Sequence, residues 1–234
     1  MPTTLANAAH VVDLFFEPGC MLQRPALVPL IMQVVDLWAH TEATFVGLVA
    51  NLLKTEPVAA TALLQAIDNQ TAQRAAIIGA AAAVLKEDDL ALFESAFLST
   101  AASRRVRHKF AHHLWGVSPQ VPDSLLLVDP KDYNTTTAEW NQILTNAQKS
   151  GGTYLILPKA RDLLRPSIYV WSESDLLEEV GSAKRAFDIT RNLAVMAFIN
   201  FSGSADAIRQ RLSADPLIHA RIQERRRKSS PKPA

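Results

Sequence analysis

The feature that most constrains the fold is a run of regularly spaced, mostly apolar residues near the N-terminus. They recur at alternating intervals of four and three, at Val34, Trp38, Thr41, Phe45, Leu48 and Leu52. Because an α-helix advances about 100° per residue, positions at these intervals return to one side of it. The pattern predicts a long helix over 30–53 with one buried seam. Such a seam also suits packing against a second copy of the chain.

Further helical patterns follow, and four of them have a candidate residue to begin them. Thr71 is expected to cap the third helix, Asp88 or Asp89 the fourth, and Ser174 a long late helix, because short polar side chains satisfy free amides at helix starts. The predicted helices after the first cover 58–67, 72–85, 90–114, 174–200 and 205–212, with a last one opened by Asp215 and Pro216.

Three short runs in the second half of the chain predict strands. They cover 125–128, 153–157 and 167–171, are rich in β-branched and aromatic residues, and are bounded by proline, glycine or aspartate. Residues 137–148 between the first two are expected to be helical. The predicted fold class is therefore mainly α with a small β insertion at about 118–172. Residues 1–24 are expected to form an irregular lead-in, and 25–220 one helical domain.

The composition limits the kinds of protein that this chain can be. Of 234 residues, 48% are hydrophobic and 20% are charged, as in ordinary globular proteins. The single cysteine, Cys20, excludes an internal disulfide framework and a cysteine-based zinc site. The N-terminus lacks the pattern of a secretory signal, and no apolar run approaches the roughly 20 residues that span a bilayer. We therefore expect a cytoplasmic protein that does not enter membranes.

Charge is unevenly distributed along the chain. The net charge is +1, but residues 221–234 contain six basic residues and one acidic residue, so the rest of the chain is net negative. A basic tail of this kind is typical of nucleic-acid contact. It is equally typical of a solvated end that cannot build a core. Both interpretations of this basic C-terminal tail stay open.

The segment from Arg104 to Gly116 holds the strongest functional signal. It contains three of the six histidines, together with three arginines. On a helical wheel with Phe97 at zero, Arg104, His108 and His112 fall at about −20°, +20° and +60°. The face that is apolar in the first half of the predicted helix thus becomes basic in the second half. This change predicts a cleft or an interface there.

Three interpretations of this segment stay open. In the first, His112 moves a proton and Arg107 stabilises phosphate charge, since imidazole titrates near neutrality and guanidinium matches a phosphate. In the second, His108 and His112 are two ligands of a metal, although no third ligand is visible nearby. In the third, the histidines only satisfy groups at a helix end, where the helix dipole favours cations.

The sequence from Arg107 to His112 resembles the Arg-x4–6-His motif of the HEPN superfamily. A polar residue commonly follows the arginine in that motif, and here it is His108. The family is a helical bundle with the motif near the end of a late helix, and the resemblance covers roughly residues 25–116. It implies a metal-independent endoribonuclease or RNA-binding effector without a cofactor, of a defence or toxin-type system. It also implies a homodimer in which two motifs face one cleft.

By that resemblance Arg107, His108 and His112 would be the catalytic residues, with Arg104, Arg105 and His113 binding substrate. The pairing is not unique, because His113 gives an Arg-x5-His spacing and Arg105 an Arg-x6-His spacing. Arg107 and His112 also lie about 140° apart on an ideal helix. They can share one phosphate only in a dimer or at a distorted helix end. The alternative function is a non-catalytic module for helical dimerisation or nucleotide binding.

Overall fold

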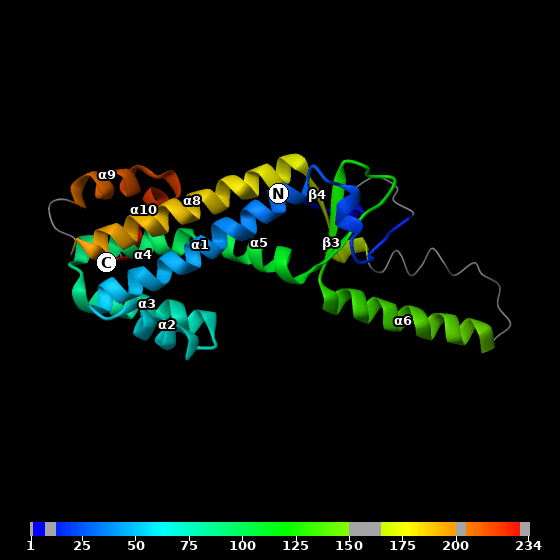
Figure 1. Ribbon diagram of the computed structural model, residues 1–234, viewed down its shortest axis with the longest axis horizontal. Coiled ribbons are helices and arrows are strands. Elements are labelled where there is room, and N and C mark those ends of the chain that lie inside the picture. The colour runs from blue at the N-terminus through cyan, green and yellow to red at the C-terminus, as the bar shows by residue number, and fades with distance from the viewer. Residues whose placement is uncertain (1, 8–12, 150–164, 200–204, 230–234) are drawn as a thin grey trace, which may run out of the picture. The chain divides into compact units, whose positions relative to one another are not determined.

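The computed structural model describes residues 2–7, 13–149, 165–199 and 205–229, which are mainly helical with one small sheet (Figure 1). The chain divides into two compact units. The sheet unit comprises residues 1–35 and 106–181, and the helical unit comprises 36–105 and 182–234. In the described part of the chain, no helix combines the length and the apolar character needed to cross a membrane.

Helix α1, Val28–Leu53, confirms the long helix predicted from the apolar seam. Trp38 and Leu48 in the seam are almost fully buried. Thr41 can be buried with them because its hydroxyl is satisfied by donating a hydrogen bond to the Leu37 carbonyl at 2.7 Å. The seam is therefore a core contact along most of its length. The spacing of the residues was sufficient to predict it.

The helical unit is built around one apolar core. Its largest buried side chains include Phe93, Leu193, Met196 and Leu212. Phe93 stacks on Phe97, with ring centroids 5.9 Å apart. The helices that carry this core, besides parts of α1 and α8 (Glu173–Phe198), are α2 (Pro57–Gln65), α3 (Gln70–Val84), α4 (Glu87–Ser99), α9 (Asp206–Ala214) and α10 (Pro216–Ser229).

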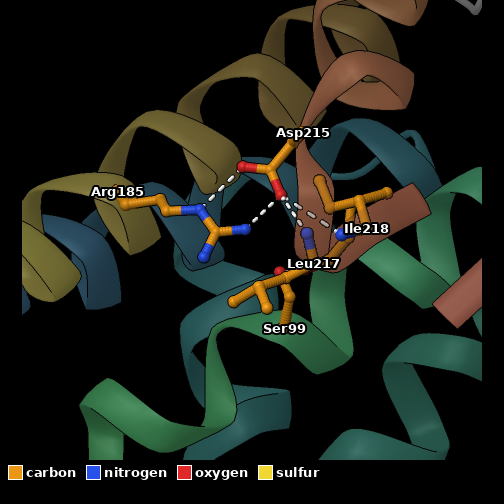
Figure 2. Close-up of polar contacts among 6 residues, drawn as sticks. Ser99, Arg185, Asp215, Leu217 and Ile218 are labelled. Atoms are coloured by element: carbon orange, nitrogen blue, oxygen red, sulfur yellow. Dashed lines mark hydrogen bonds and ion pairs between the residues drawn. The ribbon is translucent and has the colours of Figure 1, made fainter. Parts of the chain in front are cut away.

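A hydrogen-bonded ion pair holds the start of α10 in this unit (Figure 2). Two nitrogens of the Arg185 guanidinium, from α8, donate to the two carboxylate oxygens of Asp215. The same carboxylate accepts hydrogen bonds from the amides of Leu217 at 3.0 Å and Ile218 at 3.2 Å. Asp215 thus caps α10 as predicted, with Pro216 at the first helical position, and joins it to α8.

Three helix starts differ from the sequence-based expectation. Asn69, and not Thr71, caps α3, because its side chain accepts from the amide of Thr71 at 2.7 Å. The N-cap of α4 is Lys86, whose side chain makes no capping hydrogen bond, while the acidic residues lie in the first turn. Helix α8 begins at Glu173, one residue before Ser174; Ser172 and Asp175 exchange hydrogen bonds there. In each case the capping residue was misplaced by two or three positions.

The cap of α3 gives a direct test of this assignment. We expect Asn69→Ala to lower the free energy of unfolding by about 1 kcal/mol, because two amides lose their acceptor. Thr71→Ala, at the cap position expected from the sequence, should change it by less than about 0.5 kcal/mol. Urea unfolding measures both. Equal losses in the two variants would contradict the assignment.

The sheet unit contains a four-stranded antiparallel sheet in the order β1-β4-β3-β2. Strands β3 and β4 confirm two of the predicted strands, and the third, 153–157, lies outside the described residues. All four residues from Leu125 to Val128 in β3 are fully buried. The strands are β1 (Thr3–Thr4), β2 (Leu114–Gly116), β3 (Ser124–Val128) and β4 (Ile168–Ser172). The 3-10 turns are Leu5–Asn7, Cys20–Gln23 and Arg165–Ser167.

Helix α6, Pro130–Lys149, follows β3 and is longer than the predicted helix over 137–148. It starts earlier because the Asp129 carboxylate accepts from the Lys131 amide at 2.8 Å.

Strand β2 was not predicted, and the expected continuation of a helix to Leu114 is wrong. Gly116 in β2 packs directly against Phe16, and a Cβ added to this glycine would lie 2.6 Å from the Phe16 ring. A glycine is required there by this contact.

Candidate functional site

Most of the Arg-His segment lies on a helix of its own, which is shorter than the helix predicted from the sequence. Helix α5, Ala101–His112, is divided from α4 at Thr100, where one long helix was predicted. The Thr100 hydroxyl donates to the Phe97 carbonyl at 2.8 Å, as does its amide at 3.3 Å. These bonds reach back three residues, as in a tightened helix end. The wheel drawn from Phe97 therefore does not extend unchanged through α5.

The C-terminal half of α5 is anchored by aromatic packing in the sheet unit. Phe110 is buried, with its ring centroid 5.3 Å from Trp115 and 4.8 Å from Trp171. The indole of Trp115 also donates to the Phe110 carbonyl at 3.2 Å. This packing fixes which side of the helix faces inward. The opposite side is left to solvent.

On that exposed side, His108 and His112 form a pair one turn apart. Both are exposed, and their ring centroids are 4.6 Å apart with an interplanar angle of 50°. We call these two residues the imidazole face. Helix α5 contains no acidic residue, so no carboxylate of its own helix repels a ligand phosphate there. The pair can therefore donate hydrogen bonds to an anion or exchange protons with one.

The arginines of the segment have different surroundings. Arg105 is exposed, whereas Arg107 is half-buried. Arg104 is half-buried too and lines a cavity of about 320 Å³ in the helical unit, together with Glu42. Asp36 on α1 lies 3.7 Å from the His40 imidazole.

His113 has an environment unlike that of His112. Its Nε2 lies 3.7 Å from a carboxylate oxygen of Asp129, and only 11% of its side chain is exposed. Burial lowers the pKa of His113, and this outweighs the opposite effect of Asp129. The imidazole is therefore neutral at physiological pH. It is unsuited to attract phosphate by charge, although the sequence placed it among the substrate-binding candidates.

His113 also lines a cavity of about 400 Å³ in the sheet unit, beside Phe16, Cys20 and Trp115. The Cys20 thiol donates a hydrogen bond to the Trp115 carbonyl at 2.9 Å. Burial raises the pKa of this thiol, so it stays protonated and is not poised as a nucleophile. Most of the residues that line this cavity are apolar, and Glu17 is the acidic residue among them.

Lys109 makes a contact that the sequence did not predict. Its ammonium lies 4.5 Å from the centroid of the Tyr169 ring in β4, a cation–π arrangement. Nothing in the sequence pairs this lysine with a tyrosine 60 positions away, because the contact depends on how strand β4 packs. Lys109 is thereby held against the sheet, about 60° around α5 from His112.

The end of α5 is regular. The His113 amide donates to the Lys109 carbonyl at 2.9 Å, which is the ordinary helical hydrogen bond of four residues. The offset of about 140° between Arg107 and His112 therefore persists, and the two cannot meet at one phosphate within one chain. A shared site requires a second copy. Of the two possibilities considered, the distorted helix end is not present.

A metal at His108 and His112 would need at least one more ligand. Among the residues that the structure describes, no group of three histidine, cysteine, aspartate or glutamate side chains is placed to hold a metal ion.

Neither a protein family model nor a curated protein nor a solved structure matches this chain. The HEPN resemblance, and the roles that it implies for the six segment residues, stay predictions.

Proposed function

We propose that the protein binds single-stranded RNA at the imidazole face and cleaves it without a metal, as a HEPN-like endoribonuclease. The observation that carries this proposal is the exposed pair of His108 and His112, 4.6 Å apart on a helix without acidic residues. Phosphate oxygens and neighbouring hydroxyls are the groups that such a pair can hydrogen-bond. The Arg-x4-His spacing from Arg107 supports the same function.

The reaction uses a nucleophile that RNA itself supplies, the 2′-hydroxyl. The 2′ oxygen forms a bond to phosphorus, and the bond between phosphorus and the 5′ oxygen breaks. One proton leaves the 2′-hydroxyl and one is added to the 5′ oxygen, which gives a cyclic phosphate and a 5′-hydroxyl end. No atom changes its oxidation state, so proton transfer and charge stabilisation are sufficient.

We propose different tasks for the two histidines. The attacking and leaving oxygens lie roughly in line on opposite sides of phosphorus. Two rings 4.6 Å apart on one helix approach the phosphate from the same side, so they do not supply both proton transfers. His112 performs one transfer and His108 contacts a phosphate oxygen. Arg107 of a second copy stabilises the developing charge, and water performs the other proton transfer.

The test is incubation of the purified full-length protein with end-labelled single-stranded RNA in excess chelator. We expect cleavage to a cyclic phosphate, and at least about a hundredfold slower cleavage by His112→Ala. His219→Ala is the matched control, because His219 is an exposed histidine on α10 outside the segment. RNA with a 2′-deoxy residue at the cleaved position should bind and remain intact.

The outcomes separate the parts of the proposal. Undiminished cleavage by His112→Ala would show that this residue is not catalytic. A second outcome is that RNA binds the wild type but is not cleaved, and that substitution of His108 or His112 weakens the binding. That result would support an RNA-binding effector and exclude the endoribonuclease. Failure to bind RNA at low salt, where phosphate contacts are strongest, would overturn both.

A further inference from the structure

A cavity of about 500 Å³ opens in the helical unit where α1 and α3 end and α4 begins. Apolar side chains line part of its wall, among them Leu52, Val84 and Ala197. Lys54, Lys86 and Arg209 supply positive charge to the same cavity. Its volume lies within the range of about 300–1,000 Å³ typical of small-molecule sites. None of these residues belongs to the Arg-His segment.

Lys54 occupies a position in the backbone that favours glycine. It follows the last residue of α1 with φ +51°, and no other non-glycine residue in the described ranges has a positive φ. The Thr55 amide donates to the Ala50 carbonyl at 3.0 Å, and the Lys54 amide to the Asn51 carbonyl at 3.4 Å. This is the usual left-handed helix end, at which glycine avoids a steric penalty that lysine incurs.

Lys86 occupies a second position that helix stability disfavours. It is the N-cap of α4, with an extended backbone and no capping hydrogen bond from its side chain. Serine, threonine, aspartate and asparagine are preferred there, since they accept from a free amide. A cation near a helix N-terminus is also opposed by the helix dipole. Two helix ends that meet at one cavity thus each carry a lysine that costs stability.

The remaining cation of the cavity is already neutralised. The Arg209 guanidinium donates to Asp89 at 2.7 Å and to Asp206 at 2.7 Å. In the described part of the chain, neither Lys54 nor Lys86 forms an ion pair. Both lysines are exposed, and Asp89, the acidic residue in the described part of the cavity lining, is already bonded to Arg209. Glu87 and Asp88 follow Lys86 in the first turn of α4 but are not among the lining residues. A ligand that complements this cavity is anionic at one end and apolar at the other.

We propose that this cavity binds a small organic phosphate, with Lys54 and Lys86 contacting the phosphate and the apolar wall covering the organic body. Lysine is a common phosphate ligand that acts as a compact charge. The binding site explains why two lysines stand where glycine and a short polar residue would stabilise the helix ends. It is independent of the RNA reaction proposed for the imidazole face.

The test is titration calorimetry of the full chain with ATP, and with tripolyphosphate and adenosine as its two halves. We expect ATP to bind more tightly than either. Lys54→Gly and Lys86→Ser should each weaken ATP binding about tenfold, while each raises the melting temperature by about 2 °C. Weaker binding by a more stable protein cannot be attributed to misfolding. Lys184→Ala, at an exposed α8 lysine outside the cavity lining, should leave the affinity unchanged.

Three results would overturn the proposal. The first is no binding of ATP at millimolar concentration by the wild type. The second is wild-type affinity in both Lys54→Gly and Lys86→Ser. The third is tripolyphosphate binding as tightly as ATP, which would mean that the apolar wall covers no ligand.

Discussion

Replacing Phe93 by alanine is expected to lower the free energy of unfolding by about 4 kcal/mol, the largest effect of any single change considered. Phe93 is 0% exposed and stacks on Phe97 within the core of the helical unit. Removing the ring loses its burial and leaves a cavity that the surrounding helices cannot fill completely. Chemical denaturation followed by circular dichroism measures the loss.

Phe198→Ala is the matched control, because that phenylalanine is 73% exposed at the end of α8. It should change the free energy of unfolding by less than about 0.5 kcal/mol. Similar losses at the two positions would mean that Phe93 does not lie in the core.

Asp215→Ala is expected to cost the next largest amount, about 2–3 kcal/mol. The substitution removes the cap of α10 and leaves the Arg185 guanidinium without its carboxylate (Figure 2). The estimate is below that for a fully buried pair, because the Arg185 side chain is 34% exposed. Asp215→Asn keeps an acceptor for the helix amides and should lose only about half as much.

The contribution of Asp215 also depends on pH. Burial acts to raise the pKa of Asp215, but hydrogen bonds from Arg185 and from the amides of Ile218 and Leu217 outweigh it, so the pKa lies below 3.8. A carboxyl with a lowered pKa in the folded state stabilises the fold above its unfolded value, and this stabilisation is lost as pH falls through the folded value. The difference in the free energy of unfolding between wild type and Asp215→Asn should therefore have its full value at pH 6 and decrease below pH 3.8. A difference that stays constant over that range would contradict the ion pair.

Local patterns were sufficient to predict much of the secondary structure. The spacing of Trp38 and Leu48 indicated the buried side of α1, and the pair Asp215-Pro216 indicated the start of α10. Both signals depend on neighbours within a few turns of one helix. For the same reason the buried strand β3 was visible as a short apolar run.

The errors occurred where distant residues decide the local structure, or where several local alternatives compete. Leu114 to Gly116 form a strand because β3 provides a partner for pairing, although the preceding sequence is helical. The break at Thr100 depends on local hydrogen bonds that interrupt an otherwise helical pattern, since its hydroxyl and its amide both donate to the Phe97 carbonyl. The observed helix caps, Asn69, Lys86 and Ser172, also differ from those expected. Several candidate residues stand side by side at each helix start, and only the backbone conformation selects one.

For the candidate site, the sequence by itself determined which chemical groups are present. It brought three arginines and three histidines into one segment, and the four-residue interval between His108 and His112 set them on one side of a helix. The tertiary structure alone decided which of these groups reach solvent. Packing of Phe110 against Trp115 and Trp171 turns His108 and His112 outward, while burial beside Asp129 keeps His113 neutral. Exposure and charge depend on contacts between residues far apart in the chain, and those contacts exist only after the sheet has formed.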